Sequence, residues 1–181
     1  DVSDPTNPTI VGGVDTDSVA YAVTLAGRYA YVADLSNGLE IIDVSDPTNP
    51  TIVGGVDTDG FALAVTLAGR YAYVADGSNG LEIIDVSDPT NPTSVGGVDT
   101  DGTAWDVTLA GRYAYVADGG NGLEIIDVSD PTNPTIVGGV DTIDARGITL
   151  AGRYAYVADL SNGLEIIDVS DPTNPTSVGG V

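Results

Sequence analysis

A long tandem repeat dominates the chain. The stretch DVSDPTNPTIVGGV at residues 1–14 returns, with only an Ile/Ser exchange, from Asp43, Asp85, Asp127 and Asp168. The interval is 42 residues, except for the last, which is 41 because the fourth unit lacks one residue near Ile143. A repeat of this length predicts a fold in which one supersecondary unit is stacked against copies of itself.

Each unit is predicted to hold four short strands. In the unit 15–56 we expect them at 20–25, 29–34, 39–44 and 51–56, because Val, Ile, Thr and Tyr dominate there and Gly and Pro punctuate them. Asn37-Gly38 predicts a hairpin with a type I′ turn. The two prolines of SDPTNP end the third strand, since proline has no N–H for the ladder, and Gly54-Gly55 predicts a bulge.

The predicted strands carry apolar residues on both faces, as in YAYVA and LEII. Such strands need cover on both sides, and radial stacking of four-stranded antiparallel sheets supplies it. We therefore predict an all-β fold, a β-propeller of four blades of about 42 residues at 15–56, 57–98, 99–140 and 141–181. A stacked β-helix with two coils per unit is the alternative.

Five copies of the opening stretch for four blades leave residues 1–14 as a surplus N-terminal outer strand. An open apolar strand edge promotes association. We expect residues 1–14 or 168–181 to pair with another subunit by strand addition, giving a homo-oligomer or fibre. The alternative is that the chain is an excerpt of a longer array.

The repeated unit resembles a known family. The pattern YAYVAD-x-x-NGLEIIDVSDPTNPTxVGGVDT is similar to the LVIVD repeat of bacterial and archaeal surface or secreted proteins, with LEIID in the place of the name motif. The resemblance implies a propeller and an extracellular or cell-surface location. It implies no common catalytic site.

Composition excludes several functions. The 27 acidic residues against five basic ones give a net charge of −22, which repels nucleic acid phosphates and anionic membranes. The chain has no Cys, His or Met, so thiol chemistry, Cys/His zinc sites and histidine proton transfer are ruled out. No apolar run approaches the roughly 18 residues of a membrane span. We expect neither nucleic acid binding nor membrane insertion.

Differences between the units gather at one predicted end of each blade. They occur between the fourth strand and the next first strand, and in the turn after the second strand. Aromatic and charged groups there could bind a glycan or an extended peptide. The alternative is drift in a tolerant loop. The candidate ligand-binding residues are Tyr21, Leu63, Trp105 and Arg146, which share one position of the repeat, and Phe61 nearby.

The opposite, constant end combines one Arg per unit with acidic turns. We expect ion pairs between these arginines and the aspartates Asp43 and Asp46 or their equivalents; the arginines are Arg28, Arg70, Arg112 and Arg153. Calcium could bind the same acidic turns, although the spacing lacks an EF-hand pattern, and no other cofactor or metal is expected. A rigid, proline-fixed turn is the favoured interpretation of the threonines beside the prolines of SDPTNP, and O-glycosylation is the alternative. The candidate sites are Thr48, Thr51, Thr90, Thr93, Thr132 and Thr135.

Two functional hypotheses follow. The favoured one is a non-catalytic structural module of the cell surface that self-associates into a larger ring, array or fibre. The alternative is a lectin-like or peptide-binding propeller that uses the variable end. Catalysis is not expected, because the candidate carboxylates recur identically in every unit, at Glu40, Glu82, Glu124 and Glu165.

Overall fold

The computed structural model describes the backbone of residues 1–181 and every side chain except that of Ser161. Within these described residues, sixteen strands form four four-stranded sheets, each a consecutive antiparallel meander. Blade 1 holds β1 (Ala22–Ala26), β2 (Tyr29–Ala33), β3 (Leu39–Asp43) and β4 (Thr51–Val56); blade 2 holds β5 (Ala64–Ala68), β6 (Tyr71–Ala75), β7 (Leu81–Asp85) and β8 (Thr93–Val98); blade 3 holds β9 (Asp106–Ala110), β10 (Tyr113–Ala117), β11 (Leu123–Asp127) and β12 (Thr135–Val140); blade 4 holds β13 (Ala145–Ala151), β14 (Tyr154–Asp159), β15 (Gly163–Asp168) and β16 (Thr176–Gly180).

The register within a blade agrees with the sequence pattern. Strands begin and end within about two residues of the predicted positions, the largest difference being β1, which starts at Ala22. On the outer strand, Ile41 pairs with Gly54 and Ile42 with Ile52, so Val53 is the extra residue of a bulge. The predicted bulge is therefore confirmed beside Gly54.

The predicted hairpin between the second and third strands is present, but its predicted turn type is wrong. Leu35 and Gly38 take positive φ angles of 42° and 71°, whereas a type I′ turn needs positive φ at Asn37. Two overlapping turns form instead, because the N–H of Asn37 donates to Asp34 O and that of Gly38 to Leu35 O. This longer loop leaves the Asn37 amide free to donate to the carbonyl of Thr16 at 3.0 Å.

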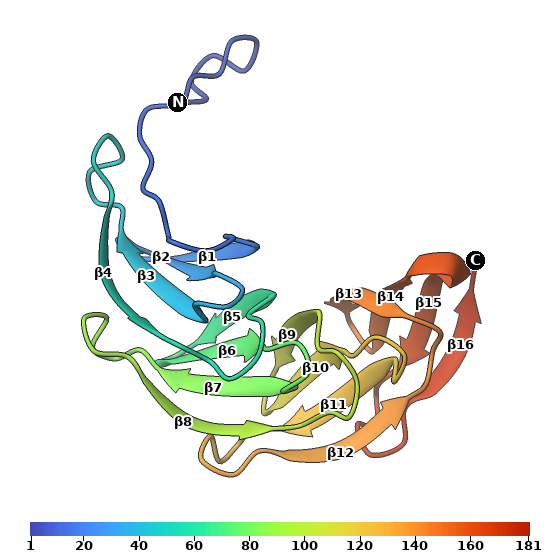
Figure 1. Ribbon diagram of the computed structural model, residues 1–181. Coiled ribbons are helices and arrows are strands. Elements are labelled where there is room, and N and C mark those ends of the chain that lie inside the picture. Colours follow the sequence, from blue (N-terminus) through green and yellow to red (C-terminus); the bar gives the residue numbers. More distant parts are fainter.

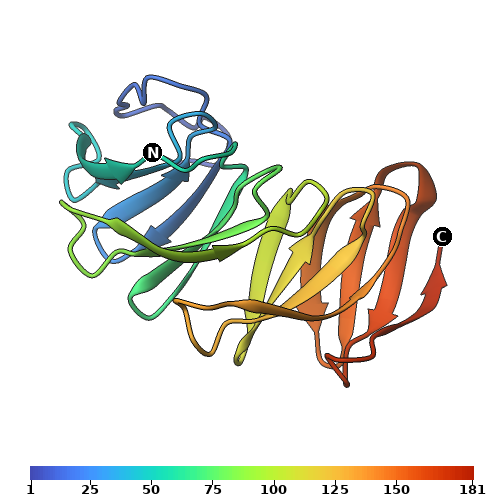
Figure 2. The ribbon, with the colours of Figure 1, turned by 60° about the horizontal axis from the view of Figure 1, so that its bottom comes forward.

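The four blades are arranged in an open arc (Figure 1). The first strands β1, β5, β9 and β13 follow the concave edge, and the fourth strands β4, β8, β12 and β16 follow the convex edge. Blades 1 and 4 lie at opposite ends of the arc in both views (Figure 2). Four separate radial sheets confirm the propeller architecture and exclude the β-helix. The blades do not close into a ring, so the first strands border an open concavity.

Residues 1–14 lie outside the four sheets, as a surplus segment should, but they form no ladder within a single chain. Residues 9–14 could pair with the outer edge of β15, but β16 already occupies that edge. Among the described residues the one helix is a 3-10 turn at Leu160–Asn162. No described helix is long and apolar enough to span a membrane.

Candidate functional site

Each blade has two different apolar faces, because side chains alternate along its middle strands. In blade 1, Tyr31, Ala33, Leu39 and Ile41 form what we call the Tyr face. The opposite side, the Val face, carries Ala30, Val32, Ile42 and Val44, together with Val23 of the first strand. The same two faces recur in the other blades.

The interfaces between blades always join one face of each kind. The Tyr face of blade 1 packs on the Val face of blade 2, formed by Val65, Ala72, Val74, Ile84 and Val86. Equivalent residues join blade 2 to blade 3 and blade 3 to blade 4. Each interface buries its residues almost completely, so the arc is held together by three copies of one apolar contact.

The two ends of the arc leave one face of each kind without a neighbouring blade, and both faces are exposed only in part, since Val32 and Ile42 on the Val face of blade 1 are 5% exposed. On the Val face of blade 1, Val23 is 62% exposed, whereas its equivalents Val65 and Val107 are 6% and 5% exposed. On the Tyr face of blade 4, Leu164 is 36% exposed, whereas Leu81 and its other equivalents are fully buried. The exposed faces are therefore the two unmatched halves of the interface used inside the chain.

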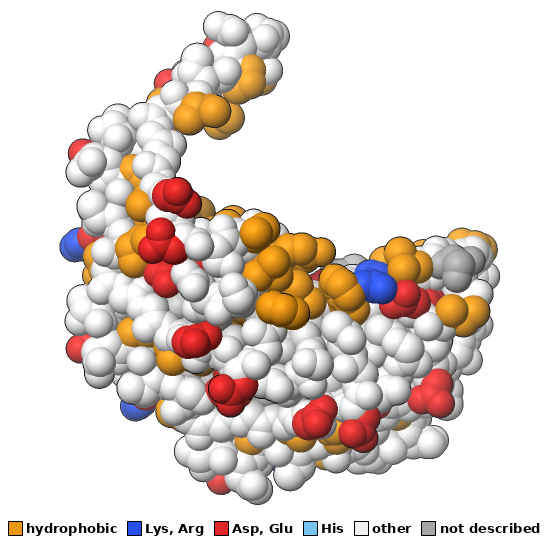
Figure 3. All heavy atoms as spheres, viewed as in Figure 1, with side chains coloured by type: hydrophobic (Ala, Val, Ile, Leu, Met, Phe, Trp, Pro, Cys, Tyr) orange, Lys and Arg blue, Asp and Glu red, His pale blue; other side chains and the backbone are white. Residues whose placement is uncertain are grey.

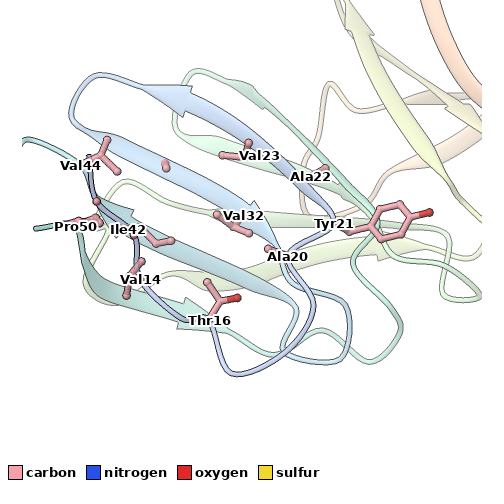
Figure 4. Close-up of a pocket in the computed structure, with 13 residues that line it drawn as sticks. Val14, Thr16, Ala20, Tyr21, Ala22, Val23, Val32, Ile42, Val44 and Pro50 are labelled. Atoms are coloured by element: carbon pink, nitrogen blue, oxygen red, sulfur yellow. The ribbon is translucent and has the colours of Figure 1, made fainter. Parts of the chain in front are cut away.

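Residues 12–16 run along the Val face of blade 1, beside an apolar groove of about 570 Å³ (Figure 4). Val14 lies near Ile42, while Tyr21 extends away from both. Inside the chain, the Tyr face of the preceding blade packs on the equivalent Val face. The groove therefore lies where the Tyr face of a preceding blade would pack.

The predicted ligand-binding residues lie along the concave rim, but they are not alike. Tyr21 and Phe61 are 54% and 58% exposed, whereas Leu63 is buried at 6% and presents little surface to a ligand. The guanidinium of Arg146 lies 3.7 Å from the centre of the Trp105 ring. Figure 3 shows hydrophobic side chains gathered on this concave edge.

Arg146 is already engaged within the chain. It stacks on Trp105 and donates from Nη2 to Asp144 Oδ2 at 2.9 Å. Arg146 occupies the bulge between Ala145 and Gly147 of β13, in the unit that lacks one residue. The shortened connection therefore directs this one unrepeated arginine onto the neighbouring blade.

The constant end contains the predicted ion pairs. Arg28 binds Asp43 and lies 5.3 Å from the Tyr29 ring centre, and the other blades repeat the pair. The arginine lowers the pKa of its partner carboxyl well below the usual range at Asp43, Asp85 and Asp127. These pairs tie the first turn of a blade to the end of its third strand.

The candidate threonines are exposed at this end. The hydroxyl of Thr48 donates to Asp46 Oδ1 at 2.7 Å, and Thr90 and Thr132 repeat that bond, which stabilises the turn. Thr51, Thr93 and Thr135 begin the outer strands. Among the described side chains, no group of three or more acidic residues is arranged to hold a metal ion.

Sequence reasoning missed a buried network behind the variable end. Asp34, Asp76 and Asp118 are fully buried, and each accepts a hydrogen bond from the threonine hydroxyl that precedes its blade, Thr16, Thr58 or Thr100. Burial raises the pKa of Asp118 to about 6. The Asp-Thr and Ala-Asp dipeptides, which recur in every unit, are the sequence pattern that could have indicated this network.

In blade 4 the buried aspartate has different hydrogen-bond donors. Asp159 accepts from the backbone N–H groups of Ile143 and Asp144, at 3.1 and 2.5 Å. The hydroxyl of Thr142, buried in the described structure, has no hydrogen-bond partner there. The missing residue of this unit thus moves the connection so that backbone groups replace the threonine.

These features define a propeller-like repeat module. The LVIVD repeat model matches residues 1–16, 19–58, 59–100, 101–142 and 144–181. The chain belongs to the LVIVD repeat family. No curated protein matches it.

Two computationally designed proteins share the fold. The crystal structure of the designed Ika4 protein is 4% identical to this chain, with a TM-score of 0.71 over 88% of this chain and 97% of that one. The designed Ika8 protein is also 4% identical, with a TM-score of 0.71 over 95% of this chain and 52% of its own, so the present chain spans about half its length.

Proposed function

We propose that this protein is a non-catalytic structural module, located extracellularly or at the cell surface, whose copies associate end to end. The observation that carries the proposal is that the two faces without a neighbouring blade are complementary halves of an interface made three times within the chain. The occupant of each face is a second copy of this chain. The location rests on the family resemblance alone.

Continuity with the internal interfaces supports this occupant. The Tyr face of blade 4 has the same residue types, in the same register, as the Tyr faces that are buried elsewhere in the chain. Joining it to the Val face of blade 1 of a neighbour makes a head-to-tail contact. Such contacts give rings if the rotation closes and fibres if it does not.

A structural role also agrees with the carboxylates. Burial raises the pKa of Glu124 to about 7, a change that elsewhere can indicate an active site. Here the raised carboxylates belong to the repeat, since Glu40 and Glu82 show the same direction of change. Asp118 is fully buried, so a substrate has no access to it.

A second function is favoured by one feature of the concave rim. Tyr21 and Phe61 are the exposed aromatic candidates there, and exposed rings are suited to stack on a sugar or a peptide. Glycan or peptide binding that is lost in Phe61→Ala and Tyr21→Ala, with assembly unchanged, would support this function.

The test of self-association is sedimentation of the purified chain over a range of concentrations. We expect species larger than one chain, and more of them at higher salt, because the net charge of −22 opposes association and salt screens it. Val23→Glu and Leu164→Glu should each shift the distribution to single chains. Ile143→Glu is the matched control, since Ile143 is 58% exposed and lies outside both faces. Single chains at every concentration and salt would refute the proposal.

A further inference from the structure

We propose that residues 9–14 of one copy form the outer strand of blade 4 of the preceding copy, in place of β16. This inference rests on the proposed self-association and specifies its mechanism. Residues 9–14 read TIVGGV, and the outer strands β4 and β12 have the same sequence. The segment therefore has the sequence of an outer strand but lacks a blade.

Residues 12–16 already lie where a preceding blade would place them. A side chain at Gly12 would collide with the carbonyl of Pro47, as one at Gly54 would with Pro89 and one at Gly96 with Pro131. Thr16 donates to the buried Asp34 at 2.7 Å, as Thr58 and Thr100 do in their blades. The path from Gly12 to Thr16 thus repeats the path by which each outer strand enters the next blade.

Only one segment can hold that position when two copies meet. Gly179 of β16 is the equivalent of Gly12, and nothing in the described chain lies near the point to which a side chain there would project. If the neighbour docks with the geometry of the internal interfaces, its Gly179 has to lie against Pro47, where Gly12 already lies. Either residues 9–14 or β16 must give way.

Three contacts favour residues 9–14. Within their own chain, Thr16 is held from two sides, by Asp34 and by the Asn37 amide. On the neighbour, Ile10 replaces Ser177 opposite Ile167, restoring the Ile–Ile pair that Ile42 and Ile52 make in blade 1. Apolar cross-strand pairs of this kind stabilise a sheet.

The strand that gives way is weakly held. Every residue of β16 is exposed, whereas β4, β8 and β12 each have three half-buried residues. Val178 is 55% exposed, while its equivalents Val53, Val95 and Val137 pack against the apolar clusters. Exchange also makes the outer strand of one copy continuous with the first blade of the next, as each outer strand is inside the chain.

A pair of double cysteine variants distinguishes the two strands. Asp168 pairs with Thr176 across β15 and β16, and Thr9 is the equivalent of Thr176. Directly opposed residues of two strands lie within reach of a disulfide. The chain has no cysteine, so Thr9→Cys/Asp168→Cys and Thr176→Cys/Asp168→Cys each carry only the two introduced cysteines. Single-cysteine variants control for random cross-linking.

Under mild oxidation we expect Thr9→Cys/Asp168→Cys to shift from the mass of one chain to that of two or more on a denaturing, non-reducing gel. Thr176→Cys/Asp168→Cys should form its disulfide within one chain to a much smaller extent. The exchange is overturned if the chain sediments as an oligomer, yet the first variant stays uncross-linked and the second closes within one chain. Single chains at every concentration and salt would instead overturn the proposed function, and the exchange with it.

Discussion

The interface between blades 2 and 3 and the two outer faces of the arc are formed by equivalent residues of the repeat. Their surroundings differ. Leu81 and Ile83 are fully buried between blades, whereas Leu164, the equivalent of Leu81 in blade 4, is 36% exposed. The side chains are identical, and only the presence of a neighbouring blade differs. In a repeat protein, the burial of a residue is therefore a property of its neighbours as much as of its own unit.

The largest expected effect tests this difference directly. Leu81→Ala should lower the free energy of unfolding by about 2–5 kcal/mol, the usual range for a buried leucine in a packed core. Leu164→Ala should cost clearly less in the single chain, because part of that side chain already contacts water. Urea unfolding, followed by circular dichroism at concentrations where the chain is single, compares them. Equal losses would contradict the comparison.

A smaller effect is expected from the buried hydrogen bonds. Thr100→Val removes the donor to Asp118, at 2.6 Å, in a fully buried site and should cost about 1–3 kcal/mol. Thr132→Val removes a bond of 2.7 Å to Asp130 in an exposed turn, where water replaces the partner, so it should change stability by about 0.5 kcal/mol or less. The same unfolding measurement decides. A loss at Thr132 as large as that at Thr100 would show that burial is not the cause.

Stability should also depend on pH through the buried carboxylates. Burial raises the pKa of Glu124 to about 7 and that of Asp118 to about 6, from ordinary values of 4.5 and 3.8. The folded chain then keeps protons that the unfolded chain has released, so the free energy of unfolding should fall as the pH rises from 5 to 7.5.

Glu124→Gln, which cannot titrate, is the control for this pH dependence. We expect it to flatten the pH profile, whereas relief of the overall negative charge at low pH would persist in the variant. Urea unfolding at several pH values measures both slopes. Identical slopes would remove Glu124 as a cause.

The smallest effect concerns the ion pairs, which should not depend on blade position. Arg112 and Arg153 are 58% and 60% exposed, although one belongs to an inner blade and the other to the terminal blade. Because exposed ion pairs contribute little to stability, Arg112→Gln and Arg153→Gln should have equally small effects on unfolding. A much larger loss at Arg112 would show that these pairs also sense the neighbouring blade.

Local features were predictable because each depends on residues within one unit. The alternation in YAYVA, the prolines of SDPTNP and the Gly54-Gly55 pair predicted the strands, their ends and the bulge. The Arg28–Asp43 pair joins the turn before β2 to the end of β3, so the hairpin register alone brings it together. The Asn37-Gly38 turn type was predicted wrongly because the loop consists of two overlapping turns and places the positive φ at Leu35, a conformation that a leucine in the sequence does not indicate.

The sequence by itself determined the repeat, the four-stranded blade and the fifth copy of the outer-strand sequence, since these follow from short-range patterns that recur along the chain. Only the tertiary structure decided which apolar side chains are buried. It left Val23 and Leu164 exposed, buried Leu63 and stacked Arg146 on Trp105. The physical reason is that burial depends on how adjacent sheets are placed in space, and nearly identical units carry no local mark of which of them has a neighbour.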